Sequence, residues 1–288
     1  MTTNPGSKFS AGPLALLAVV GFVTVVATLL VTAHLWVFGR DLEASPRHLT
    51  ALLGVPLHAL ILVGTWGALR YEGVSLTDVG VDHTRILPGT AAFAAFLATV
   101  TLAGVGYLVA TGGTAELGFS YSMPWYWVPV WFVLTLTISN GLTEEFVFRG
   151  YAQSKCIAAA SPRLGRLSPA AGIVAAGVLF GVPHVPRGLL LEGASMAAIP
   201  WIFLENLVGG GIVFGVLYYL TRNVWFVGFV HGWANSVPVV MPFDPGAVPY
   251  FTPMAIVVGL AVALGYRYRA NDDGGVDATR PPAASGRS

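Results

Sequence analysis

The sequence has little charge and almost no cysteine. Only 10% of its 288 residues are Asp, Glu, Lys or Arg, whereas a soluble domain carries about 25%. Because 55% of the residues are hydrophobic, one core of this size cannot hide them all behind a polar coat. The single cysteine, Cys156, cannot form an internal disulfide, and a net charge of +1 supplies no basic surface for nucleic acid. The composition therefore argues against a soluble enzyme, a disulfide scaffold and a nucleic-acid-binding protein.

The hydrophobic residues lie in long blocks, several of about 20 residues, which is the length that a helix needs to cross the hydrocarbon core of a bilayer. The blocks do not alternate apolar and polar residues as the strands of a membrane barrel do. We therefore predict an all-α, polytopic membrane protein with about eight transmembrane helices. The expected helices cover about residues 13–38, 50–68, 89–111, 125–150, 168–184, 199–220, 224–241 and 251–266. The first block is too long for a cleaved signal peptide and is expected to remain as a helix.

Basic residues predict the orientation, because cytoplasmic loops are enriched in Lys and Arg. With eight spans and a cytoplasmic N-terminus, the inner segments hold Lys8, Arg70, Arg85, Lys155, Arg163, Arg166, Arg222, Arg267, Arg269, Arg280 and Arg287, and the outer loops hold Arg40, Arg47 and Arg187. Both termini are therefore expected in the cytoplasm. Residues 1–12 would form a cytoplasmic N-terminal segment, residues 13–268 the membrane domain, and residues 269–288, rich in Gly, Pro, Ala and charge, a disordered cytoplasmic tail.

Several ionisable residues lie within or at the ends of the expected spans, where their insertion is costly and usually serves a function. Glu145 and Arg149 are four residues apart, so they lie on one helix face and are expected to form an ion pair. Glu144 is rotated by about 100° from Glu145 and has no basic partner on its own face. A carboxylate of this kind suits a general acid or base.

Two further expected spans supply nitrogen groups. His231 and Asn235 are four residues apart, so the pair can donate hydrogen bonds to one oxygen, as in an oxyanion hole, or hold a metal or a polar solute. His184 comes from another helix. Glu144, His184 and His231 could activate a water molecule, either by taking its proton or as zinc ligands. The sequence has neither a His-Glu-x-x-His nor a Gly-x-Ser-x-Gly motif.

Each group also has a structural interpretation. The Glu145–Arg149 pair could only position its helix, Glu144 could face water, His184 could cap a short helix, and Asn235 could hold two helices together. His34 and His58 stand alone in early spans and are expected to be structural. Two other functions stay open: a non-catalytic binding or bacteriocin-immunity protein, and a transporter or proton relay built on the same buried groups.

Three short motifs together resemble one family. Glu144–Arg149 (EEFVFR) resembles the Glu-Glu-x-x-x-Arg motif of the CPBP intramembrane proteases, which include the type II CAAX prenyl endopeptidases and bacteriocin-processing proteins. Phe180–His184 resembles the Phe-x-x-x-His motif of that family, and His231–Asn235 resembles its His-x-x-x-Asn motif. The resemblance covers about residues 143–235, roughly a third of the chain, within a protease-like core at 125–241.

The resemblance implies a membrane-embedded endopeptidase that uses zinc or a glutamate base, with its cavity open to the cytoplasmic side. It assigns activation of the water to Glu144 and His184, stabilisation of the oxyanion to His231 and Asn235, and support of the helix to Glu145 and Arg149. The expected partners are the lipid bilayer and a peptide or protein substrate, which in the eukaryotic relatives is lipidated. The expected location is the plasma membrane of a prokaryote.

One geometric conflict accompanies this assignment. If the fourth span runs straight from an outer Trp125, Glu144 lies about 28 Å along it. His184 would lie about 24 Å outward along a straight fifth span that starts at the inner side. Because proline ends or bends a helix, Pro183 and Pro186 predict a short or broken fifth helix. The segment Val185–Ile199 would then fold partly back into the membrane, covered by protein or a wet cavity.

Overall fold

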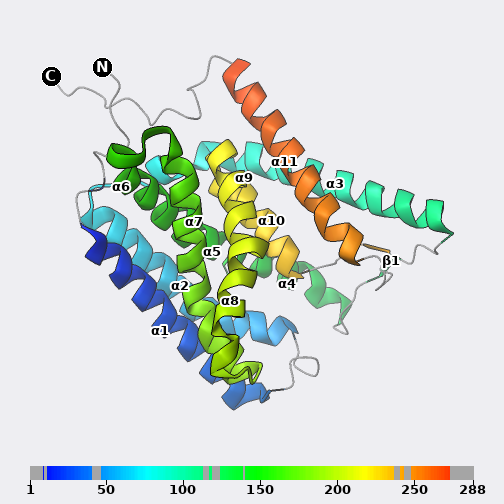
Figure 1. Ribbon diagram of the computed structural model, residues 1–288. Helices are drawn as coiled ribbons and strands as arrows, with labels where there is room; N and C mark the ends of the chain where they lie inside the picture. Colours follow the sequence, from blue (N-terminus) through cyan, green and yellow to red (C-terminus); the bar gives the residue numbers. More distant parts are fainter. Residues whose placement is uncertain are drawn as a thin grey trace.

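The computed structural model describes residues 9, 12–40, 47–112, 117–118, 124–138, 140–236, 241–242 and 248–272, and this part of the chain is almost entirely helical (Figure 1). The α-helices are α1 (Pro13–Phe38), α2 (Arg47–Tyr71), α3 (Ile86–Thr111), α4 (Val128–Leu136), α5 (Gly141–Glu145), α6 (Ser154–Leu164), α7 (Ser168–Gly181), α8 (Ile199–Asn206), α9 (Val213–Thr221), α10 (Val224–Ser236) and α11 (Val248–Asp272). Shorter 3-10 turns are η2 (Thr77–Val79), η3 (His83–Arg85), η4 (Trp125–Trp127), η6 (Gly165–Leu167), η7 (Val182–His184) and η9 (Met196–Ala198). Three segments are π-helical: η5 (Phe146–Gln153), η8 (Arg187–Leu191) and η10 (Leu207–Ile212). Two two-residue strands, β1 (Leu117–Gly118) and β2 (Met241–Pro242), pair antiparallel.

The helices have the lengths and surfaces of a membrane protein. Large apolar side chains such as Leu14, Trp36 and Leu102 are 78%, 88% and 72% exposed, which suits contact with lipid. Within the described residues, five helical segments are long and apolar enough to span a membrane: Pro13–Phe38, Leu49–Tyr71, Thr77–Thr111, Val128–Leu191 and Met196–Thr221. The predicted count of eight spans is therefore not confirmed. The predicted fourth and fifth spans fall in one of these segments, and α10 has only 13 residues.

The fourth predicted span is not one straight helix over 125–150. Helix α4 ends at Leu136, and α5 begins at Gly141. Between them Thr137 has φ −111° and ψ −102°, and Asn140 has φ −164° and ψ −86°, which are not helical angles. Glu144 therefore lies in the first turn of a helix and not near the end of a long one. The large separation of Glu144 and His184 was estimated for a straight fourth span. Because the span is broken, that estimate does not apply.

The α-helical part of the fifth predicted span is short, as expected. Helix α7 has 14 residues, and Val182–His184 continues it as a 3-10 turn that contains Pro183. The π-helical segment η8 follows, and residues 192–195 are not helical. The predicted segments 1–12 and 269–288 lie outside the described residues, apart from residues 9, 12 and 269–272.

Helices α5 and α10 approach each other through glycines. A Cβ atom on Gly141 would lie 2.1 Å from the carbonyl oxygen of Gly228, and one on Gly232 would lie 2.6 Å from Cα of Leu136. Gly228 and Gly232 are four residues apart and share one face of α10. Small residues allow such backbone contact between membrane helices. The contact fixes how far α10 stands from the start of α5.

Buried polar contacts close the end of the bundle at which α1 begins, which is called the closed end below. Nζ of Lys155 lies 2.6 Å from Oε2 of Glu72, and the hydroxyl of Tyr151 donates to Oε1 of Glu72 at 2.5 Å. The hydroxyl of Tyr218 donates to the carbonyl of Val79 at 2.9 Å. These bonds join the end of α2 and the loop after it to η5, α6 and α9. The opposite end, where α1 ends and α2 begins, is called the α1–α2 end.

The glycine contact predicts a stability difference between two Gly→Ala variants. Gly141→Ala forces the α5 and α10 backbones apart, so we expect a loss of about 1–3 kcal/mol, typical of overpacking, and a lower Tm in detergent. Gly67→Ala in α2 is the matched control, because no atom lies within 4 Å of the added Cβ. The control should hold or slightly raise Tm. Equal melting temperatures for the two variants would contradict the close approach.

Candidate active site

Glu145 is the buried centre of the site. Its side chain is 0% exposed, and its Oε2 accepts a hydrogen bond from Nε of Arg149 at 3.1 Å. The ion pair expected from the i, i+4 spacing is therefore present. Arg149 is also 0% exposed, its guanidinium lies 5.2 Å from the ring centre of Phe180, and its Nη2 is 3.4 Å from the carbonyl oxygen of Gly210. The charges of the pair are thus compensated inside the bundle.

His231 is the second partner of Glu145. Its Nδ1 lies 2.7 Å from Oε1 of Glu145. Because a carboxylate only accepts, the Nδ1 carries the proton of this bond. The ring stacks on Phe214 with 4.4 Å between ring centres, so its orientation is fixed from two sides. The sequence assigned Glu145 only to supporting its helix and did not predict this contact between α5 and α10.

The other ring nitrogen of His231 faces Glu144. Nε2 of His231 lies 3.8 Å from Oε2 of Glu144, which is too long for a hydrogen bond. This oxygen of Glu144 is buried and has no hydrogen-bond partner in the described part of the chain. The Glu144 side chain as a whole is 24% exposed. Glu144 thus has an unsatisfied acceptor beside a histidine, at a point that solvent can reach.

Glu144 opens onto a cavity of about 570 Å³. The wall opposite α5 comes from α1 and α2, and the remaining wall from α4, η7, η8 and the end of α10. The polar lining residues are His34, Thr50, His58, Thr135, Asn140, Thr143, Glu144, His184, Arg187 and Asn235, and most of the others are aliphatic or aromatic. The cavity therefore combines a largely apolar wall with a few convergent polar groups, which is typical of a substrate site.

His184 shares this cavity with Glu144. Its Nδ1 lies 2.7 Å from the carbonyl oxygen of Phe180, and because a carbonyl accepts, Nδ1 is the donor. The other ring nitrogen, Nε2, is then the one left to act on a bound molecule. The Phe180 ring lies 4.5 Å from His184 and 5.9 Å from His231, measured between ring centres. Phe180 thus separates and positions the two histidines.

Asn235 and His231 are not equivalent in the site. Asn235 is exposed and lines the cavity, whereas His231 is 4% exposed and is not one of the lining residues. The sequence predicts that both side chains face one oxygen. In the structure only Asn235 lines the cavity.

The candidate zinc set of Glu144, His184 and His231 does not fit a metal site. Among the described residues, no group of three or more His, Cys, Asp or Glu side chains is arranged to hold a metal ion, and structural or catalytic zinc needs at least three protein ligands. The interpretation as a metalloprotease is therefore not supported.

Sequence reasoning missed two histidines of the cavity wall. His34 and His58 were expected to be structural, yet both line the cavity that holds Glu144. His34 is 4% exposed, and its Nε2 has no hydrogen-bond partner in the described part of the chain. Nδ1 of His58 lies 2.8 Å from the carbonyl oxygen of Gly54. An isolated histidine in an apolar span was the available signal, but only the packing of the helices shows that both histidines line the cavity.

The cavity also bears on the predicted orientation. Its lining residues on α1 run from Val23 to His34, and those on α2 from Thr50 to Ile61, so the cavity lies toward the α1–α2 end. A cytoplasmic N-terminus would put that end on the outer side. The two sequence predictions, termini in the cytoplasm and a cavity open to the cytoplasm, therefore point to opposite ends of the bundle.

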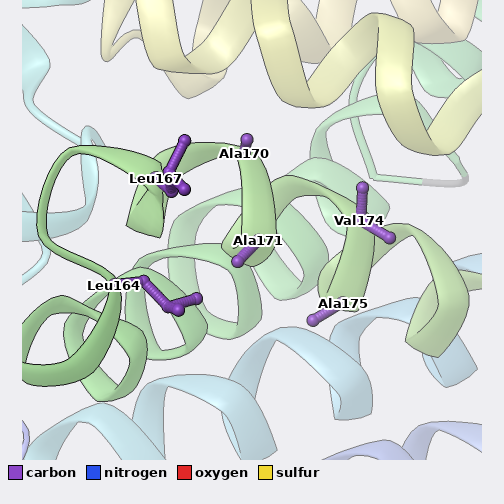
Figure 2. Close-up of a pocket in the computed structure, with 6 residues that line it drawn as sticks. All are labelled: Leu164, Leu167, Ala170, Ala171, Val174 and Ala175. Carbon is purple, nitrogen blue, oxygen red and sulfur yellow. The ribbon is translucent and has the colours of Figure 1, made fainter.

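A second concavity, of about 590 Å³, is lined by aliphatic side chains alone. It lies over the α6–α7 turn and the first half of α7 (Figure 2) and is lined by Leu164, Leu167, Ala170, Ala171, Val174 and Ala175. A lining of this kind suits contact with lipid chains, and it offers nothing that could activate water.

The buried ion pair predicts a stability effect. Arg149→Gln leaves Glu145 without its guanidinium in the interior, and breaking a buried pair costs about 3–5 kcal/mol, so we expect a strong fall in folded yield and Tm. Arg187→Gln breaks an exposed pair with Glu192, whose side chains are 57% and 46% exposed, and should cost at most about 1 kcal/mol. Thermal unfolding in detergent measures both. Similar losses would contradict the distinct role of the buried pair.

Comparison with known proteins gives one match. No curated protein and no solved structure matches the chain. A protein-family model does match the region that runs from the 3-10 turn before α4 to the end of α10. This region contains the three motifs and all four residues assigned to chemistry. Residues 125–237 of the chain match the family model described as Type II CAAX prenyl endopeptidase Rce1-like.

Proposed function

We propose that the protein is an intramembrane endopeptidase of the CAAX-protease type, which hydrolyses a peptide bond with a water molecule activated by Glu144. The observation that carries the proposal is the buried, unpartnered Oε2 of Glu144, 3.8 Å from Nε2 of His231, at the wall of a cavity of about 570 Å³. A matched family domain over residues 125–237 supports the same activity. An integral membrane location follows from the helices suited to span a bilayer.

In the proposed reaction, water in the cavity forms a bond from its oxygen to the carbonyl carbon of the substrate. Glu144 takes the proton that the water loses, and His184 helps to orient the water through Nε2. Glu144 then delivers the proton to the leaving amide nitrogen as the carbon–nitrogen bond breaks. Each proton is accounted for within the site, as general acid–base catalysis requires.

The tetrahedral intermediate carries a negative charge on its oxygen, and hydrogen-bond donors aimed at this oxygen lower the barrier. We assign this role to Asn235, which lines the cavity, and to His231 when its Nε2 is protonated. Glu145 supports the second assignment, because its carboxylate holds Nδ1 of His231 at 2.7 Å and stabilises the imidazolium. Glu145 and Arg149 are positioning residues in this scheme, since they bond to each other and Glu145 also holds His231.

The cavity wall supports a peptide or protein substrate with apolar groups beside the cleaved bond. Val23, Val26, Ala27, Leu30 and Ile61 line the side formed by α1 and α2. Burial there of apolar groups that come from water is favourable by about 25 cal/mol per Å². An apolar side chain or a lipid-modified residue would each gain from this wall.

Replacement of Glu144 tests the assignment. Glu144→Gln keeps the shape of the side chain but removes the base, so we expect cleavage to be abolished with an unchanged Tm. Quantitative mass spectrometry of membrane peptides, from cells with the wild type and with the variant, measures the loss. Glu205→Gln is the matched control, because Glu205 is exposed on α8 and does not line the cavity. Peptides that accumulate equally in the wild type and Glu144→Gln would contradict the proposal.

The arrangement of the possible metal ligands predicts the metal content of the purified protein. Because no three-ligand group is present among the described residues, we expect the purified protein to contain much less than one zinc ion per chain and to keep its activity in a chelator. Elemental analysis and activity after dialysis against the chelator measure this. Equimolar zinc, or activity that the chelator removes and zinc restores, would contradict the assignment of Glu144 as a base that acts without a metal.

A further inference from the structure

The two ends of the bundle differ in charge. Phe9, the start of α3 and the ends of α2, α9 and α11 meet at the closed end, as the contacts of Lys155 with Phe9, Arg85 with Arg222, and Asn223 with Tyr266 show. The basic residues of the described closed end are Arg70, Arg85, Lys155, Arg163, Arg166, Arg222, Arg267 and Arg269, and those of the α1–α2 end are Arg40, Arg47 and Arg187. The rule that cytoplasmic loops are enriched in Lys and Arg therefore assigns the closed end to the cytoplasm.

The cavity lies nearer the other end. At 1.5 Å per residue, Val23 and His34 stand about 15 and 32 Å along α1, which is about 39 Å long. The lining residues of α2 fall within about its first 21 Å. Arg187 lines the cavity from η8, and its side chain is 57% exposed. The cavity thus reaches solvent on the side of the α1–α2 end.

The described residues of the closed end are tightly packed. Glu72, Tyr151 and Tyr218 are at most 2% exposed there, and Lys155 is 5% exposed. Their hydrogen bonds join the end of α2 and the loop after it to η5, α6 and α9. These segments would have to move apart to open a path at the closed end. A water molecule or peptide moving from the closed end to Glu144 would have to break a buried ion pair, which is costly.

From these observations we infer that the cavity opens to the outer, non-cytoplasmic face of the membrane, and that its ligand is a polypeptide segment presented from that face. The inference rests on the proposed function for the identity of the ligand as a polypeptide, but the side of entry rests only on charge and cavity placement. The entrance carries the cation of Arg187, which lies close enough to His34 to act on it electrostatically. Substrates would therefore be exported proteins or segments in the outer leaflet.

Thiol labelling tests the side of entry without any substrate. Cys156, the single cysteine, is first replaced by serine, and Thr50→Cys, Glu192→Cys or His83→Cys is then added to the full-length chain. Thr50 lines the cavity, Glu192 marks the surface of the α1–α2 end, and His83 is exposed at the closed end. A membrane-impermeant maleimide is applied to right-side-out and to inside-out vesicles from the expressing cells.

We expect Thr50→Cys and Glu192→Cys to be labelled in right-side-out vesicles and to lose labelling in inside-out vesicles, and His83→Cys to show the reverse. The opposite pattern for all three overturns the inference, as does labelling of Thr50→Cys from the side that labels His83→Cys. The same pattern is expected in a Glu144→Gln background. A failure of the proposed protease activity would thus leave the labelling unchanged, so the two can be told apart.

Discussion

The backbone contact between α5 and α10 determines the site. Gly141 and Gly228 leave no room for a side chain between the two helices, and the gain from this close packing replaces the hydrophobic driving force that lipid removes. Only at this separation does His231 reach Glu145, at 2.7 Å. Glu145 then holds Arg149 with its other oxygen, so one carboxylate joins two helices, and Oε2 of the neighbouring Glu144 has no hydrogen-bond partner among the described residues. Glu144 is therefore available for the role that we propose because Glu145 has already bound the nearby donors.

Local spacing predicted the parts of the site that lie within one helix. The Glu145–Arg149 pair follows from a four-residue separation, and the first helix, at 13–38, follows from a block of apolar residues. The bond between His231 and Glu145 could not be predicted this way, because 86 residues separate the partners and either histidine could have met either carboxylate. The roles of His34 and His58 depended on the packing of α1 and α2 for the same reason.

The interruption of the fourth span was also not predicted from the sequence. Pro129 of this apolar block lies in the first turn of α4, where proline does not break a helix. The Asn140-Gly141 pair is typical of turns, but such a pair alone does not require a break. The proline pair at 183 and 186 did predict the short α7. The interruption after α4 arises from tertiary packing, since Gly141 must meet Gly228 while Thr143 donates its hydroxyl back to Ile138 at 2.9 Å. Hydropathy gives the length of an apolar block but cannot place such a turn within it.

The ion pair between Glu72 and Lys155 has a consequence for how the chain is assembled. Glu72 precedes the matched domain, and Lys155 lies inside it. Glu72 is synthesised before Lys155, so this ion pair can form only after α6 has been made. A fragment that starts at Trp125 would lack that carboxylate and the cavity wall of α1 and α2 together. The first two helices thus supply a wall of the cavity and a buried ion-pair partner that lie outside the matched region.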